Sequence, residues 1–453
     1  MTEITIIQNT DILTMEDGPV LRHGNLWLQD GKILKIEEKP IEQQQIEQYQ
    51  RERQIAEYRM GEQQTEIHRM EEQQTEQKQT GEFPENACVL DGEGCTVIPG
   101  LIDAHCHYDE SYMGDMFLAS GVTSVRNMRG YRRHAEWRDE ILAGKRRGPY
   151  LYSSGPICDG EDPSIPNNDN EIIRTEEDVE AAIRYVREND FLWMKTYPSI
   201  EPELYRYLLK RCQEEKLPMC GHMTKKMDPC YLADHGYICC EHTSSLPADP
   251  EKIRYLAESG MWFCPTHVVC ETLPDYVWNG KQLKEVEHYM DLPECVRERW
   301  EAENQVTIAS YREQNVHPDF QMIIDRALTF LKYSKRIMAG SDCPYAGIVP
   351  GFSMADELER LTGVYGMEPY EALCAATCYP AQHMGIEKEK GRILPGMDAD
   401  LVLLEGNPLE EIGNIRRIRR VFQGTRSWDK EALQQFLSAV SKLKKEEIEF
   451  IIA

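Results

Sequence analysis

The sequence has no long apolar run, no surplus of positive charge and no Cys-x-x-Cys pair, and each absence excludes a class of protein. No segment approaches the roughly 20 apolar residues of a membrane-spanning helix. The 453 residues carry a net charge of −27, which makes nucleic acid and anionic membrane surfaces poor partners. Because 41% of the residues are hydrophobic, we expect a folded core in one large domain with additions, or in two domains.

The use of cysteine gives a second exclusion. The 15 cysteines are odd in number and include no Cys-x-x-Cys pair. Several of them, such as Cys239, Cys240 and Cys264, lie in apolar runs, which is typical of reduced core thiols rather than of a disulfide framework. The N-terminal residues also lack the basic and apolar segments of a secretory signal. These features together predict a cytoplasmic protein.

What the sequence does contain is an alternation of short apolar runs with helical patterns between residues 99 and 389. Eight runs read as strands, and helix-like segments separate them. Thr175, for example, is positioned to cap a helix and to receive a reciprocal contact from Asp178. Residues 270–317 are less regular and read as an excursion over the site. The alternation predicts an α/β fold with a (β/α)8 TIM barrel.

The first strand of this pattern contains the motif VIPGLIDAHCH at residues 97–107. The Pro99-Gly100 step divides the apolar run into two strands. His105 and His107 are two residues apart, so in a strand both imidazoles point to the same face and can bind one metal ion. Two ordinary core or surface histidines are the alternative, and the motif alone does not exclude it.

Similar polar residues follow the later strands. A histidine, lysine or aspartate alone at such a position is more often a packed or solvated residue. The carboxyl ends of barrel strands, however, are where this fold places its chemistry. A set that recurs at successive strand ends therefore favours one common site; its members are His105, His107, Lys195, His222, His242, His267 and Asp342.

The two ends of the chain predict a small composite β-sandwich domain. Strand-like runs occur near the N-terminus, where Asp30-Gly31 is a hairpin signal, and again near residues 392–424. A Gln/Glu-rich segment reads as a passive insertion, with a partner-binding role as the alternative. The expected units are 1–39 with 87–98 and 390–425 in the small domain, the insertion at 40–86, the barrel at 99–389 and a C-terminal helix within 426–453.

The ordered motifs resemble those of the metal-dependent amidohydrolase superfamily, and most closely its prolidase- and imidazolonepropionase-related branch. The matching pieces are the 99–107 motif, Lys195, His222, His242, the Gly340-Ser341-Asp342 step, and the downstream motifs at 371–381, 391–396 and 399–409. The resemblance covers nearly the whole chain except the insertion and the last helix.

The resemblance implies a binuclear metal site. His105, His107 and Asp342 would bind one divalent ion, and His222 and His242 the second. Lysine cannot act as a ligand while it is an ammonium ion. The resemblance implies that Lys195 is N-carboxylated by CO2 and bridges two ions, most simply Zn(II), with Mn, Co and Fe as alternatives. Asp342 would move the proton during hydrolysis of an amide C–N bond.

The sequence offers weaker candidates for substrate binding. Tyr197 lies two residues after Lys195, and His267 follows the seventh strand. Arg126 and Arg129 follow the second strand and are candidates to bind a substrate carboxylate, with a structural ion pair as the alternative for both.

Three functions remain at this point. The first is a binuclear amidohydrolase acting on a dipeptide, an N-acyl amino acid or a cyclic amide. The second is a deaminase of the same superfamily, which would use one metal and no bridging lysine. The third is a non-catalytic scaffold, for which the insertion is the only argument. We expect a small-molecule substrate, and a homo-oligomer is possible.

Overall fold

The computed structural model describes residues 4–451 except 17, 39–83, 85–86, 164–168, 316 and 318. The Gln/Glu-rich segment assigned to 40–86 therefore lies outside the described residues, apart from Pro84. Within the described ranges, no helix is long and apolar enough to cross a membrane.

A parallel barrel sheet forms the centre of the molecule. Seven of its strands are joined in the order β13-β12-β11-β10-β8-β7-β6, and the two-residue strand β9 (Glu171–Ile172) pairs with β8. The (β/α)8 prediction is confirmed. The seven strands are β6 (Leu101–Cys106), β7 (Val122–Asn127), β8 (Tyr150–Asp159), β10 (Trp193–Thr196), β11 (Met219–Gly221), β12 (Tyr237–Glu241) and β13 (Trp262–Cys264).

Residues 336–343 close the barrel between β13 and β6 as the eighth strand. Parallel bridges join Phe263 to Ile337 and Cys106 to Cys343. Gly340 is required at this junction, because a Cβ atom there would lie 2.6 Å from the Cβ of His105. The absence of a side chain lets the eighth strand approach the strand that bears the His-x-His motif.

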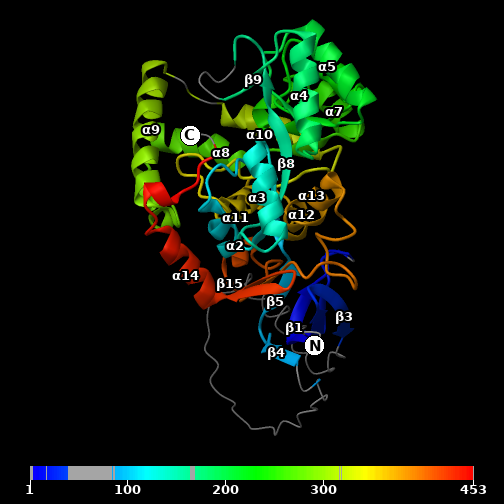
Figure 1. Cartoon of the computed structure of the whole chain (residues 1–453), viewed down its shortest axis with the longest axis vertical. Coiled ribbons are helices and arrows are strands. Elements are labelled where there is room, and N and C mark those ends of the chain that lie inside the picture. The colour runs from blue at the N-terminus through cyan, green and yellow to red at the C-terminus, as the bar shows by residue number, and fades with distance from the viewer. Residues whose placement is uncertain are drawn as a thin grey trace, which may run out of the picture.

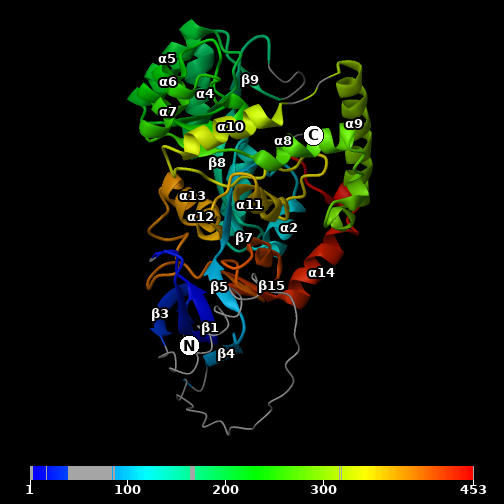
Figure 2. The same ribbon diagram turned by 180° about the vertical axis from the view of Figure 1, so that it is seen from behind.

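Helices surround the barrel, as Figures 1 and 2 show from opposite sides. Thr175 and Asp178 form the predicted capping box at the start of α4. The helices are α2 (Met113–Ala119), α3 (Arg132–Leu142), α4 (Glu176–Glu188), α5 (Pro202–Glu214), α6 (Pro229–Asp234), α7 (Pro250–Glu258), α10 (Phe320–Leu331), α11 (Ser353–Gly363), α12 (Pro369–Ala375) and α13 (Cys378–Met384).

A second sheet lies at one end of the long axis (Figure 1) and combines both ends of the chain. Its order is β16-β15-β14-β5-β1-β2-β3, with β4 paired to β1, and most pairs are antiparallel. The predicted Asp30-Gly31 turn joins β2 to β3. The strands are β1 (Ile4–Leu13), β2 (Leu21–Gln29), β3 (Lys32–Glu38), β4 (Ala87–Asp91), β5 (Thr96–Pro99), β14 (Leu401–Leu404), β15 (Ile418–Gln423) and β16 (Arg426–Asp429).

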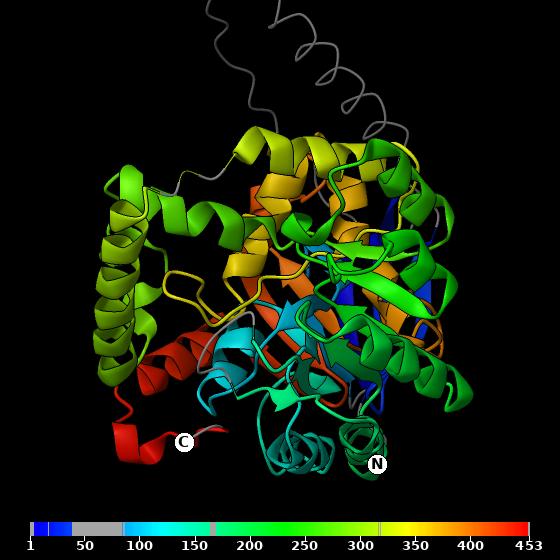
Figure 3. The same ribbon diagram turned by 90° about the horizontal axis from the view of Figure 1, so that it is seen from above.

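Two segments differ from the expectation. Residues 270–317 are largely helical, because α8 (His267–Trp278) and α9 (Glu294–Glu313) occupy most of them, and Figure 3 shows α9 at one side of the molecule. Residues 426–429, assigned to the C-terminal helical unit, form β16 because they pair with β15. The helix α14 (Lys430–Val440) follows, with Asp429 as its N-cap, and packs against α2.

Candidate metal centre

The six predicted metal ligands lie at the same end of the barrel. Each is in the last residues of a strand or directly after it, because parallel strands end at one rim of a barrel. His105 is in β6, Lys195 is in β10, and Asp342 is in the eighth strand, whereas His107, His222 and His242 follow the ends of β6, β11 and β12.

Asp342 is the centre of this group. Its Oδ1 atom lies 3.3 Å from Nε2 of His105 and 3.2 Å from Nε2 of His107. Its Oδ2 atom lies 3.7 Å from Nδ1 of His242. Ligand atoms of His105, His242 and Asp342 all lie within 4.8 Å of one another, which is close enough for one ion to contact all three.

His222 and Lys195 extend the group on the side of His242. The ring centroids of His222 and His242 are 4.2 Å apart. Lys195 is fully buried, and its Nζ lies 5.8 Å from the ring centroid of Tyr197. Tyr197 in turn packs edge-on against His222, with ring centroids 4.4 Å apart. The structure thus brings all six predicted ligands into one cluster.

The unsatisfied polar atoms of this cluster fit a metal centre. Among the six clustered residues, all of which the structure describes, four buried nitrogens have no hydrogen-bond partner: His105 Nε2, His107 Nδ1, His222 Nδ1 and Lys195 Nζ. Buried polar atoms are normally paired, so such a group calls for an explanation. Imidazole nitrogens and a carboxylate are donors that zinc accepts, so a bound cation would account for unpaired imidazole nitrogens, whereas Lys195 could be a ligand only after losing its ammonium charge.

The electrostatics of the cluster keep its donors in ligand form. Burial lowers the pKa of His107, takes that of His222 well below its usual range, and brings that of His242 to about 3. Burial also lowers the pKa of Lys195. Asp342 stays ionised, because the neighbouring His242 and His105 outweigh burial and hold its pKa well below the usual value. Neutral imidazoles and a carboxylate are the forms that bind metal.

The amidohydrolase family model matches residues 96–428, a span that contains all six clustered side chains. The chain belongs to the amidohydrolase family. The predicted membership is confirmed, and with it the assignment to hydrolases that act on carbon–nitrogen bonds. Metal binding is general in this family, which agrees with the donor set of this amidohydrolase.

Known proteins similar to this amidohydrolase include ochratoxinase from Aspergillus niger, which is 24% identical over 380 residues, or 70% of this chain and 71% of the relative. A solved Xaa-Pro dipeptidase superposes with a TM-score of 0.66 at 18% identity, covering 94% of this chain and 100% of the other. Bottromycin amidohydrolase gives a TM-score of 0.69 at 19% identity, covering 96% and 90%. These structural neighbours have the same fold, a barrel with a separate second sheet.

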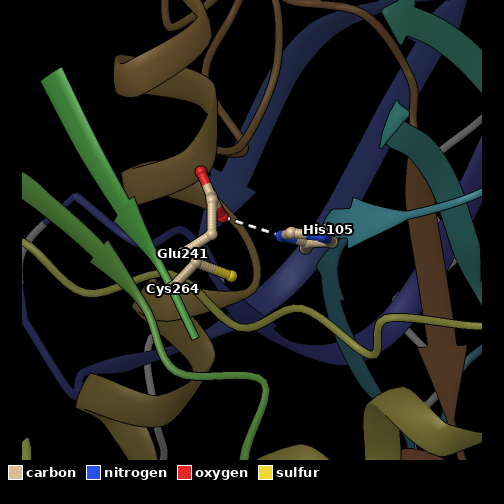
Figure 4. Close-up of side chains that lie close together, drawn as sticks. All are labelled: His105, Glu241 and Cys264. Carbon is tan, nitrogen blue, oxygen red and sulfur yellow. Dashed lines mark hydrogen bonds and ion pairs between the residues drawn. The ribbon is translucent and has the colours of Figure 1, made fainter. Parts of the chain in front are cut away.

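Glu241, which the sequence analysis did not select, orients His105. Its Oε2 lies 2.7 Å from Nδ1 of His105 (Figure 4), and its Oε1 accepts a 2.9 Å hydrogen bond from Arg126. All three side chains are fully buried. With Nδ1 bound to a carboxylate, the imidazole of His105 presents Nε2 to Asp342. The only sequence signal was the position of Glu241 directly before His242.

Arg126 does not occupy the position expected of a substrate ligand. Its guanidinium also donates to the carbonyl oxygen of Ala104 and lies 5.0 Å from the ring centroid of Trp193. The side chain is therefore inside the barrel, below the ligands, and forms the structural ion pair that was its alternative. The strand alternation could not reveal this, because the partner Glu241 is 115 residues away.

His267 is likewise engaged by protein groups. Its Nδ1 lies 2.8 Å from the hydroxyl of Tyr365, and its Nε2 lies 2.8 Å from Oε1 of Glu271. It is fully buried at the first turn of α8. Both ring nitrogens are used, so in this structure His267 supports the end of the seventh strand rather than facing a substrate.

Two further contacts hold ligands in place. Oγ1 of Thr266 lies 2.7 Å from Nδ1 of His242. Asp103 accepts hydrogen bonds from the backbone of His105 and from the backbone and hydroxyl of Ser341, which ties the first strand to the eighth. His242, Thr266 and Asp342 all have positive φ angles, of 64°, 45° and 58°. Such strained conformations persist where the surroundings fix them, often at functional sites.

Proposed function

We propose that this amidohydrolase is a binuclear metal-dependent enzyme that hydrolyses an amide C–N bond. The observation that supports this most directly is the convergence of four imidazoles and a carboxylate around a buried lysine whose Nζ has no hydrogen-bond partner in the described ranges. A single-metal site has no use for that lysine. A structural lysine would have a carboxylate partner.

The proposal assigns each ligand a role. His105, His107 and Asp342 would hold one ion and His222 and His242 the other, and Lys195, once N-carboxylated, would supply a further anionic ligand. The lowered pKa of Lys195 favours the neutral amine, which is the form that adds to CO2 with loss of one proton. When bound, a divalent ion lowers the pKa of water to about 7 and polarises a carbonyl group. Zinc is our first expectation for both positions.

The protein side chains supply the proton transfer. Asp342 is an ionised carboxylate within 3.3 Å of a ligand nitrogen, so it is placed to accept the proton of the attacking water. It then delivers that proton to the leaving nitrogen, which departs as an amine. Tyr197, which packs against His222, is placed to donate a hydrogen bond to the substrate carbonyl.

The substrate class in this proposal is a dipeptide, an N-acyl amino acid or a cyclic amide. The similarity to a solved Xaa-Pro dipeptidase makes dipeptides ending in proline the first probes, and N-acylated amino acids follow as the second class. The released amine is the quantity to measure in such a screen.

Metal analysis of protein purified without added metal tests the proposal. We expect close to two ions per chain by elemental mass spectrometry, and fewer after Lys195→Ala. One ion per chain together with released ammonia would favour the deaminase. Protein that binds added zinc no better than a His105→Ala control would contradict any catalytic function.

A further inference from the structure

The loop after the His-x-His strand is tied to three separate parts of the molecule. Asp109 forms an ion pair with Arg129, which follows β7. Glu110 is buried and accepts a 2.6 Å hydrogen bond from Arg299 of α9. The loop begins two residues after His107, and the backbone N–H of Asp109 donates a 2.9 Å hydrogen bond to the carbonyl oxygen of His107, so the loop is joined to a predicted metal ligand.

The third attachment is the C-terminal tail (residues 448–451), which pairs with the loop as a short antiparallel strand. Its backbone exchanges hydrogen bonds of 2.8–3.0 Å with the loop, and one bond uses the hydroxyl of Ser111. Three residue pairs make the contact: Asp109 with Ile451, Glu110 with Phe450, and Ser111 with Glu449.

The side chain of Glu449 anchors this tail to the barrel. Its carboxylate accepts hydrogen bonds from Arg133 at 2.5 Å, from Arg146 at 3.0 Å and from the indole of Trp137 at 3.3 Å. Arg133 and Trp137 are on α3, and Arg146 follows it. Ile448, the residue before Glu449, is buried. The tail is thus clamped between α3 and the loop.

We propose that the C-terminal tail is a positioning element of the metal centre, acting through the loop at residues 109–111. The loop places the Asp109–Arg129 pair beside the site. Asn127 joins this pair to the strand that bears the ligands, because its Oδ1 accepts a 3.0 Å hydrogen bond from the backbone of Tyr108 and its Nδ2 donates a 2.8 Å hydrogen bond to the carbonyl oxygen of Arg129. Catalytic geometry tolerates little displacement, and an error of about 1 Å can cost 100-fold in rate. The proposal rests on the hydrolytic site described above.

The test compares the full chain with a chain ended after Glu447 and with Glu449→Ala. Glu446→Ala is the matched control, because Glu446 is an exposed glutamate just before the tail. Amide hydrogen exchange of the peptide covering residues 108–113 is the main readout. Losing tail hydrogen bonds of about 1 kcal/mol each should speed its exchange at least about fivefold. We expect exchange in α4 to stay unchanged, and a synthetic peptide of residues 445–453 to restore protection in the shortened chain.

The second readout is catalytic. With any amide that the full chain hydrolyses, we expect a rise in KM or a fall in kcat for Glu449→Ala but not for Glu446→Ala. Unchanged loop exchange, or faster exchange throughout the barrel, would overturn the proposal, and so would a loosened loop with unaltered kinetics. If the full chain hydrolyses no amide, the proposed function fails, while the exchange data still decide whether the tail fixes the loop.

Discussion

Two buried lysines in this amidohydrolase have opposite surroundings. Lys390, near the junction of barrel and sheet, is 5% exposed, contacts Asp398 at 2.8 Å and Asp400, and lies 3.7 Å from the ring centroid of Tyr150. Lys195 is fully buried, and its Nζ finds no hydrogen-bond partner among the described residues. Asp400 and Asp398 raise the pKa of Lys390 against the effect of burial, whereas burial lowers the pKa of Lys195.

The difference separates a structural charge from a reactive one. A buried ammonium is tolerated where carboxylates compensate it, as at Lys390. A buried amine without that compensation favours its neutral form, and neutral amines can react. Burial alone therefore does not identify a functional lysine. The groups that contact the lysine do identify it, and substitutions of the two lysines and their neighbours test that distinction.

The largest effect is expected from Lys195→Ala. It removes the proposed bridging group, so hydrolysis should fall by at least about 1,000-fold, equivalent to several kcal/mol of metal-assisted stabilisation. Steady-state rates and metal content per chain measure this, and added short-chain carboxylates should restore part of the rate. Full activity in this variant would remove the binuclear mechanism.

Lys390→Met should lower the stability of the fold and leave its metal content unchanged. It leaves Asp400 buried without its cation, which should lower the free energy of unfolding by about 3–5 kcal/mol. Chemical denaturation measures this, and metal content per folded chain should be unchanged. A loss of metal without a loss of stability would show that the two lysines are not distinguished as we propose.

Glu241→Gln tests the group behind His105. The amide keeps the shape of the side chain but removes the charge that holds Nδ1, so zinc affinity should fall by about 10–100-fold. Competition with a chelator of known affinity measures it. Glu271→Gln is a matched control, because Glu271 contacts His267 and no predicted ligand. Equal losses in both variants would contradict a specific role for Glu241.

The smallest effect is a difference in pH dependence, measured on metal-stripped protein. Burial lowers the pKa of Lys195 in the folded state, so below pH 10.5 the unfolded chain binds more protons at this lysine than the folded chain does. The stability that Lys195→Met gains over the unchanged protein should therefore shrink as the pH rises from 7 to 10. Lys390 has a raised folded-state pKa, so its contribution is complete below pH 10.5 and should stay constant over that range. Denaturation midpoints at several pH values measure both, and parallel curves would refute the comparison.

Much of this molecule was predictable from local pattern. Strand and helix periodicity located the barrel, and the Thr175 cap and the Asp30-Gly31 turn were read directly from side chains. The strand-end candidates followed from the rule that parallel strands end at the same rim, and the family resemblance then selected the metal ligands among them. Helices α8 and α9 were missed because the apolar residues of 270–317 show no clear period.

The sequence by itself determined which side chains lie at the strand ends, since strand alternation and the position where each strand ends are local properties. Only the tertiary structure decided what those side chains meet. Arg126 turned inward to Glu241, His267 became bound by Tyr365 and Glu271, and the C-terminal tail paired with residues 109–111. Each of these contacts joins distant parts of the chain or depends on burial, and such pairings arise only when the barrel closes and removes polar groups from water.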